Sequence, residues 1–255
     1  MSLFTWSSRR QLAVFAIFAM VVLLIVLGAI YYFRPEPTCF DKRQNQDEEG
    51  VDCGGAVARC APCSEKIHDL TILWTRLFLI KDGFYDVVSL LENGNQFLKT
   101  DKFVYAIKLY DENGVLLAAR ENSTFIAPGE KFVIFEPNVQ TQNRIPKTVI
   151  LEMRGVNWKS GEAVPIKIDV LRKDVFLTDA LNPRLEVRLK NQSASVIYKN
   201  IEASAILLEE GGAVLGGSRT MIDKLDIFEE KTIIFTWPRA IEGVLRADIF
   251  LRQAP

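Results

Sequence analysis

One uninterrupted apolar run stands near the start of the chain. Residues 11–33 contain no charged residue, and Arg10 and Arg34 flank them. As an α-helix, such a run would span roughly 34 Å, enough for the core of a bilayer, and a helix that is apolar on every face is typical of a membrane. The pattern predicts a transmembrane helix over residues 11–33, with residues 1–10 as a short tail.

The charges beside this run predict its orientation. Arg9 and Arg10 precede it, so the positive-inside rule places the N-terminus in the cytoplasm and the rest of the chain outside. A cleaved signal peptide is the alternative, but a cleavage site requires small residues, and bulky residues 30–32 follow Gly28 and Ala29. We therefore expect an uncleaved signal-anchor, a single-pass membrane protein and extracytoplasmic C-terminal domains.

Beyond residue 67 the hydrophobic pattern changes to a period of two. Apolar side chains alternate with other residues over 103–109, and they do so again over 201–207. Alternation of this kind is typical of a β-strand with one buried face. Several such short segments, separated by turn residues, predict a mainly β structure in this part of the chain.

The two alternating segments belong to an internal repeat. Asn93 and Asn191 lie 98 residues apart, and each is followed 21 residues later by a glycine, Gly114 or Gly212, in a tight-turn signal. Further matches pair residues 124–126 with 220–222 and residues 133–137 with 234–238. A repeat of about 100 residues built from short strands predicts two tandem immunoglobulin-like β-sandwiches, residues 67–157 and 158–255. One large β-domain with accidental similarity is the alternative.

A short motif in the first copy resembles a known family. Residues 107–111 read Ile-Lys-Leu-Tyr-Asp ahead of a glycine turn, and Pro128-Gly129-Glu130 follows. This order resembles the FxLYD family of small extracytoplasmic β-sandwich domains. Ile107 replaces the phenylalanine of that signature, and the second copy keeps only Leu207 of its Leu-Tyr-Asp core. The resemblance implies a β-sandwich fold and no catalytic residue.

Residues 34–66 form a cysteine-rich juxtamembrane module. The chain has four cysteines, and all lie in this module: Cys39, Cys53, Cys60 and Cys63. An even number of cysteines in a small extracytoplasmic segment predicts two disulfides, with three pairings open. A zinc site is the second interpretation, because Cys60 and Cys63 have ligand spacing. A redox pair at the same two residues is the third.

Oxygen ligands also gather in this module and suggest a calcium site. The candidates are Asp41, Asn45, Asp47, Glu48 and Asp52. Calcium takes about six to eight oxygen ligands, but the spacing differs from that of an EF-hand loop. A solvated polar loop is the alternative, and we expect no other cofactor. Gly54 and Gly55 predict a turn with unusual backbone angles.

The module as a whole also has a resemblance. It is similar to a Cys-x-Asp-Gly, Asn-x-x-Glu, Asp-Cys-Gly-Gly and Cys-x-x-Cys series that recurs beside single membrane anchors in uncharacterised bacterial surface proteins of candidate lineages. The matching residues are Cys39, Asp41, Asn45, Glu48, 52–55, Cys60 and Cys63. Lys42 stands where that series usually has glycine. The resemblance implies a module next to a membrane anchor.

Composition and motifs narrow the function. The 31 basic and 32 acidic residues give no basic excess, so we expect no nucleic-acid partner. The single histidine, His68, cannot build a relay, and Gly216-Gly217-Ser218 lacks the flanking pattern of a phosphate loop. Trp74, Trp158 and Trp237 are expected in cores, with an exposed binding anchor as the alternative.

We therefore expect a non-catalytic, membrane-anchored binding or scaffold protein of the cell envelope. Residues 11–33 would contact the membrane, and the edges or loops of the sandwiches would engage another envelope protein. An accessory subunit of a larger envelope complex, such as secretion or pilus machinery, is the alternative. A redox or metal-dependent enzyme is the third interpretation.

Overall fold

The computed structural model of the 255-residue chain describes residues 6–32, 38–45, 48, 50–55, 60, 63 and 67–253. Within the first helix, side chains are described at residues 14–29, 31 and 32. The chain divides into two compact units, residues 1–64 and residues 65–255. Each unit is a separate body with its own internal contacts.

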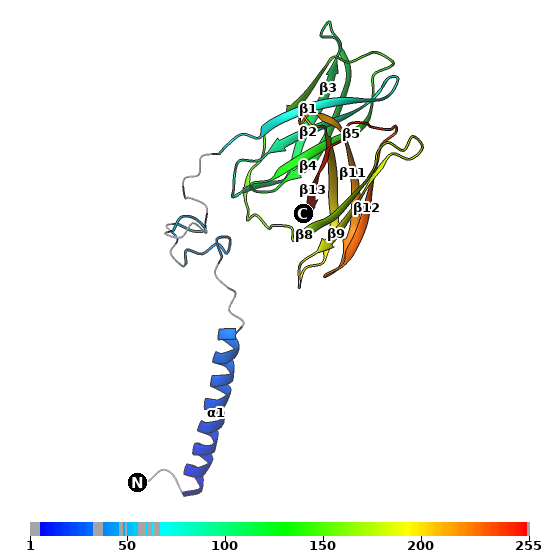
Figure 1. The fold of residues 1–255 in the computed structure, drawn as a ribbon. Helices are drawn as coiled ribbons and strands as arrows, with labels where there is room; N and C mark the ends of the chain where they lie inside the picture. Colours follow the sequence, from blue (N-terminus) through cyan, green and yellow to red (C-terminus); the bar gives the residue numbers. More distant parts are fainter. Residues whose placement is uncertain are drawn as a thin grey trace. The chain divides into compact units, whose positions relative to one another are not determined.

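The described residues of the first unit include one helix, α1, over Trp6–Tyr32 (Figure 1). Its described side chains over residues 14–29 are all exposed. In the described part of the chain, no helix combines the length and the apolar character needed to cross a membrane. The prediction of a transmembrane signal-anchor over residues 11–33 is therefore wrong. So is the single-pass topology with a cytoplasmic N-terminus and extracytoplasmic C-terminal domains.

The second unit is built from antiparallel β-strands, as the period-two pattern predicted. The first half contains β1 (Thr71–Lys81), β2 (Phe84–Glu92), β3 (Leu98–Tyr110), β4 (Leu116–Ile126), β5 (Lys131–Gln140), β6 (Thr148–Met153) and the short β7 (Lys159–Ser160). The second half contains β8 (Ile168–Phe176), β9 (Arg184–Asn191), β10 (Tyr198–Leu208), β11 (Val214–Leu225), β12 (Glu230–Thr236) and β13 (Arg246–Gln253). The prediction of a mainly β chain is confirmed.

The sheet topology repeats from one half to the other. The first half has the strand orders β1-β2-β5 and β4-β3-β6, with β7 paired to β3. The second half has the same orders, β8-β9-β12 and β11-β10-β13. Two facing sheets in each half are consistent with β-sandwiches. Because residues 65–255 form one compact unit, separate domains at 67–157 and 158–255 stay a prediction.

The repeat extends to individual hydrogen bonds. Asn93 is buried, and its Nδ2 donates to the carbonyl of Ala127 at 2.8 Å. Asn191 is equally buried, and its Nδ2 donates to the carbonyl of Asp226 at 2.9 Å. Each asparagine therefore ties the end of one strand to the turn before another. The two halves share this internal brace as well as their strand order.

Each half has its own hydrophobic core, and a third cluster lies where the halves meet. Its buried members are Val88, Val133, Phe135, Ile206 and Leu208. They come from β2 and β5 of the first half and from β10 of the second, whose sheets pack against each other (Figure 1). The sheet β1-β2-β5 is therefore covered on both faces. Burial on both faces fixes its position strongly, because moving it would expose two apolar surfaces.

Two close approaches hold the halves together at this junction. A Cβ built on Gly217 of β11 would lie 2.8 Å from a methyl carbon of Val88, so only glycine lets the two sheets come this close. The buried guanidinium of Arg252 on β13 reaches Glu130, which precedes β5. The junction is thus closed by packing at one point and by an ion pair at another.

Candidate functional site

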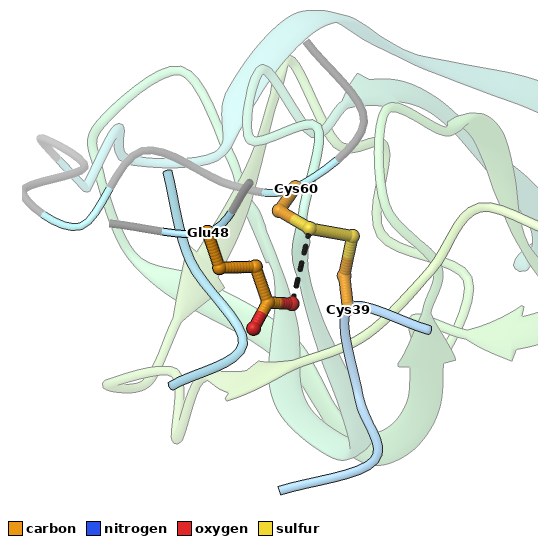
Figure 2. Close-up of side chains that lie close together, drawn as sticks. All are labelled: Cys39, Glu48 and Cys60. Atoms are coloured by element: carbon orange, nitrogen blue, oxygen red, sulfur yellow. Dashed lines mark hydrogen bonds between the residues drawn. A yellow bond between two sulfur atoms is a disulfide. The ribbon is translucent and has the colours of Figure 1, made fainter. Parts of the chain in front are cut away.

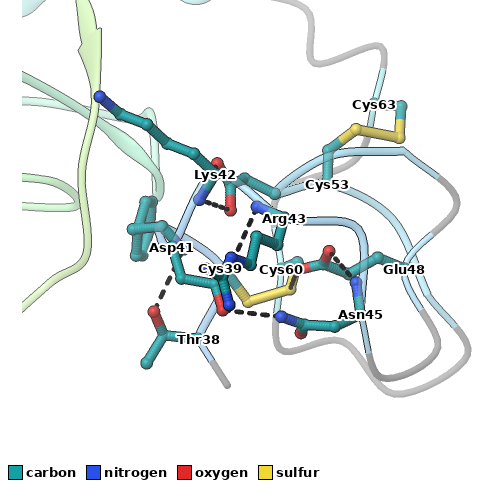
Figure 3. The surroundings of a disulfide bond; sticks show 12 residues. Thr38, Cys39, Asp41, Lys42, Arg43, Asn45, Glu48, Cys53, Cys60 and Cys63 are labelled. Atoms are coloured by element: carbon teal, nitrogen blue, oxygen red, sulfur yellow. Dashed lines mark hydrogen bonds between the residues drawn. A yellow bond between two sulfur atoms is a disulfide. The ribbon is translucent and has the colours of Figure 1, made fainter. Parts of the chain in front are cut away.

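The cysteine module contains the two disulfides that the sequence predicted. Cys39 pairs with Cys60, and Cys53 pairs with Cys63, with Cα–Cα distances of 5.2 and 4.8 Å (Figure 3). None of the described cysteines is free. Cys60 and Cys63 bond to different partners and not to each other, which removes the dithiol that a thioredoxin-type pair requires. The same bonds occupy the sulfurs that the zinc interpretation needed as thiolates.

Asp41 and Asp52 direct their carboxylate oxygens to the loop itself, and Figure 3 shows Asp41 beside Asn45. Asp41 accepts a hydrogen bond from Asn45 Nδ2 at 2.7 Å, and this bond, opposed by desolvation, lowers the pKa of Asp41 below its usual value. Both oxygens of Asp52 accept from the backbone N–H of Lys42, at 2.9 and 3.0 Å. Lys42 and Asp52 both have positive φ angles, 61° and 58°. These carboxylates therefore stabilise left-handed turns.

Glu48 also accepts a hydrogen bond from the loop backbone, but it lies beside a disulfide. Its Oε2 accepts from the backbone N–H of Asn45 at 3.1 Å, and the residue is buried. The dashed line in Figure 2 joins its Oε1 to Cys60 Sγ, 3.4 Å away. Because that sulfur is bonded to Cys39, it has no proton to donate, and the approach is a contact only.

The calcium site stays a prediction in the described residues, where Asp41, Glu48 and Asp52 accept hydrogen bonds from the loop. Asp47 lies outside those residues. The potential ligand atoms that lie within 4.8 Å of one another belong to Cys39, Glu48 and Cys60, and two of the three are disulfide sulfurs. Calcium prefers oxygen ligands, so this group does not suit it. Gly54 and Gly55 have φ angles of 75° and 115°, which confirms the predicted unusual turn.

A second candidate site lies in the unit of residues 65–255. A pocket of about 320 Å³ opens where the first and second halves meet. Its walls come from the end of β1, the start of β11 and the segment that follows β12. The side chains that shape it include Phe78, Leu79, Leu215, Trp237, Arg239 and Ile241. Most of the lining is apolar, and its charged residues are Asp86, Arg239 and Glu242.

Trp237 gives this pocket its most unusual group. The side chain is 7% exposed and belongs to the core of the second half. Its indole Nε1 is buried and has no hydrogen-bond partner in the described structure. A Cβ built on Gly216, which lines the same pocket, would lie 3.3 Å from Nε1. The glycine thus keeps a side chain away from the indole nitrogen.

Three charged residues complete the described lining of the pocket: Asp86, Arg239 and Glu242. Arg239 donates a hydrogen bond to the carbonyl of Leu79, which links the segment after β12 to β1. Asp86 accepts from the backbone N–H of Asn138 at 2.8 Å. Burial raises the pKa of Asp86 above its usual value, against the opposing effect of that hydrogen bond. The pocket therefore offers donors from Arg239 and Trp237 beside a carboxyl that ionises less readily than usual.

The sequence predicts a core position for Trp237, but it does not reveal the pocket. All three tryptophans pack in or against hydrophobic clusters, as expected: Trp74, Trp158 and Trp237. The signal that could have found the site is the glycine pair at residues 216 and 217. Glycine inside a strand often marks a place where a ligand or another backbone approaches closely. Here Gly217 meets the other half of the unit, and Gly216 faces the pocket.

Comparison with known proteins adds no identity. No protein-family model matches the chain, and no curated protein matches its sequence. The resemblances to FxLYD domains and to the bacterial cysteine module therefore stay predictions. Evidence about function comes instead from the geometry of the chain itself.

Proposed function

We propose that this chain is a non-catalytic binding protein whose pocket, at the junction of the two halves, receives part of a partner protein. The observation that carries the proposal is the buried indole N–H of Trp237, which has no partner in the described structure and lies beside Gly216 in the lining of the pocket. An unmet buried donor costs about 1–3 kcal/mol, so a ligand that supplies an acceptor there recovers that cost.

The junction supports this role because it holds the pocket walls in place before a ligand arrives. Val88 and Gly217 meet at close packing distance, and Arg252 pairs with Glu130. A site that is already formed loses little conformational entropy on binding, which strengthens affinity for a given contact area. The pocket walls come from both halves, so the same contacts that fix the junction also fix the site.

The residues of the pocket favour binding over catalysis. Its described lining contains no serine, cysteine, histidine or lysine, and one of its two carboxyl groups, that of Asp86, already accepts a hydrogen bond from the backbone N–H of Asn138. Tyr105 has a strongly raised pKa, caused first by burial, and its hydroxyl donates to Glu136 at 2.6 Å. Neither residue lines the pocket. A subunit of a larger protein complex is the alternative function.

The experiment compares two exposed positions with nearly equal exposure. Leu79 lines the pocket and is 43% exposed, whereas Ile150 on β6 is 42% exposed and lies in the other sheet of the first half. A partner captured by the full chain would be identified, purified and titrated against Leu79→Asp and Ile150→Asp. We expect Leu79→Asp to weaken binding about tenfold or more and Ile150→Asp to leave it nearly unchanged. Equal effects of the two variants would overturn the proposal.

A further inference from the structure

We infer that the pocket is specific for a peptide segment whose aliphatic side chain enters it and whose adjacent carbonyl or carboxylate oxygen accepts the Trp237 N–H. This inference rests on the proposed function and names the class of ligand. Three features of the pocket lead to it: an unmet donor, an apolar wall and an open strand edge.

The unmet donor requires an oxygen acceptor. The indole nitrogen carries one N–H and can only donate, so a ligand that satisfies Trp237 must bring an acceptor. Gly216 lines the pocket beside this nitrogen, and an alanine there would bring its methyl carbon to 3.3 Å from Nε1. Because Nε1 is buried, an oxygen in the pocket reaches the usual N–H···O distance of about 2.9–3.0 Å after a small tilt of the indole towards it. A carbonyl or carboxylate oxygen would then pair the donor, whereas a methyl group would leave it unpaired.

The size and lining of the pocket indicate what accompanies the oxygen. A volume of about 320 Å³ is at the small end for ligand sites and suits one side chain with its peptide group. Phe78, Leu215 and Ile241 present hydrocarbon to that volume. An aliphatic side chain therefore gains from burial there, and a large planar cofactor has too little room.

The position of β1 indicates that the ligand is part of an extended chain. The strand order β1-β2-β5 ends at β1, so in the described sheet β1 has a paired neighbour on one side only. Leu79 on this strand lines the pocket, and its carbonyl already accepts a hydrogen bond from Arg239. Open strand edges commonly bind extended peptides through main-chain hydrogen bonds, with pockets for alternate side chains.

Arg239, in the segment after β12, favours binding of a peptide oxygen at that side of the pocket. A guanidinium has five N–H donors, so the bond to the Leu79 carbonyl leaves other donors for a ligand oxygen. Asp86 and Glu242 also line the pocket and oppose a full negative charge. The raised pKa of Asp86 weakens that opposition. The shared chemistry is thus an acceptor oxygen, from an internal peptide carbonyl or from a terminal carboxylate.

The experiment follows the indole N–H resonances of the full chain, labelled with ¹⁵N at tryptophan. Trp237→Phe identifies the Trp237 signal by its loss. The probes are N-acetyl-leucine amide, which offers a carbonyl, N-acetyl-leucine, which offers a carboxylate, and N-acetylglycine amide, which has no side chain. We expect the Trp237 signal to move downfield and saturate with the leucine probes. Movement with the amide assigns the site to internal peptide carbonyls, and movement with the free acid alone assigns it to C-terminal carboxylates.

A matched pair of glycine variants separates the pocket from general effects. Gly216→Ala places a methyl carbon 3.3 Å from Nε1, whereas the Cβ of Gly155→Ala meets nothing within 4 Å. We expect Gly216→Ala to weaken binding of the leucine probe about tenfold or more and Gly155→Ala to leave it unchanged. In case Gly216→Ala unfolds, Trp237→Phe, followed through backbone amide signals, should weaken the same probe by a similar factor.

Three results would overturn the inference. They are an unmoved Trp237 signal at saturating probe, equal movement with N-acetylglycine amide, and unweakened binding in both Gly216→Ala and Trp237→Phe. If these occur while Leu79→Asp still weakens the partner, the ligand class is wrong and the proposed function stands. If Leu79→Asp has no effect either, both fall.

Discussion

Arg252 and Glu130 form a bidentate ion pair between the last strand and the turn before β5. Arg252 Nε lies 2.6 Å from one carboxylate oxygen of Glu130, and Nη2 lies 3.1 Å from the other. Their side chains are only 2% and 14% exposed. The guanidinium carbon also lies 4.1 Å from the ring centre of Phe125 and 4.4 Å from that of Phe132. Because the guanidinium of Arg252 is almost completely shielded from water, its charge is stabilised by these protein contacts and not by solvent.

Removing Arg252 should therefore cost more than removing a surface charge. Arg252→Met leaves Glu130 nearly buried without its partner, and breaking such a pair typically costs about 3–5 kcal/mol. Exposed pairs such as Lys159 with Asp101 typically contribute below about 1 kcal/mol, so Lys159→Met is the matched control. Urea unfolding of both variants measures the difference. A loss below about 1 kcal/mol in Arg252→Met would contradict a structural role for the pair.

Gly217→Ala should destabilise the junction, because its new methyl carbon would lie 2.8 Å from Val88. Overpacking of this kind typically costs about 1–3 kcal/mol. The double variant Gly217→Ala with Val88→Ala should recover part of that loss, since the smaller side chain makes room. Thermal unfolding of the single and double variants gives the coupling energy. Additive effects would show that the two residues do not meet in solution.

The raised pKa of Asp86 predicts how the stability of the folded protein depends on pH. Burial raises its pKa in the folded protein above the ordinary value of 3.8. A carboxyl with a raised folded pKa favours folding while it is protonated, and this contribution is lost as the pH rises through the folded pKa. Asp86→Asn cannot ionise, so it should melt at a higher temperature than wild type at about pH 7. The advantage should shrink towards about pH 3. Equal melting temperatures at neutral pH would contradict the raised pKa.

The disulfides give a chemical prediction. In the unreduced full chain, alkylation should modify none of the four cysteines, and peptide mapping should recover Cys39 with Cys60 and Cys53 with Cys63. Reduction should leave the unfolding of residues 65–255 unchanged, because both bonds lie in the unit of residues 1–64. Mass spectrometry and thermal unfolding with and without reductant check both points. A Cys60–Cys63 bond, or a reductant-dependent unfolding of the β unit, would contradict this arrangement.

Local patterns allowed much of the β structure to be predicted. The alternation over residues 201–207 has its physical basis in β10, where Ile201, Ala203, Ala205 and Leu207 are all buried in one core. The turn signals were equally direct, since Gly114 and Gly212 have φ angles of 74° and 78°. Both features depend on residues that are close in sequence, so they can be recognised without the fold.

Contacts between distant segments could not be predicted in the same way. Ile206 and Leu208 are apolar although they alternate with the residues of the core face of β10. This pattern indicates only that the other face of the strand is also covered. It does not indicate that Val88 is one of the residues that cover it. The disulfide pairing was open for the same reason, because spacing alone allows three connectivities. The apolar run near the start led to a wrong prediction, since no helix in the described part of the chain is both long and apolar enough to cross a membrane.

Gly216 and Gly217 are adjacent on β11 but have different roles. Gly216 keeps a side chain away from the indole of Trp237, whereas Gly217 lets the two halves pack closely at Val88. A shift of β11 that loosened the contact between Gly217 and Val88 would also change the distance between Gly216 and the indole of Trp237. Binding in the pocket and packing of the two halves therefore depend on the same short piece of backbone. A ligand in the pocket should also make the two halves harder to separate.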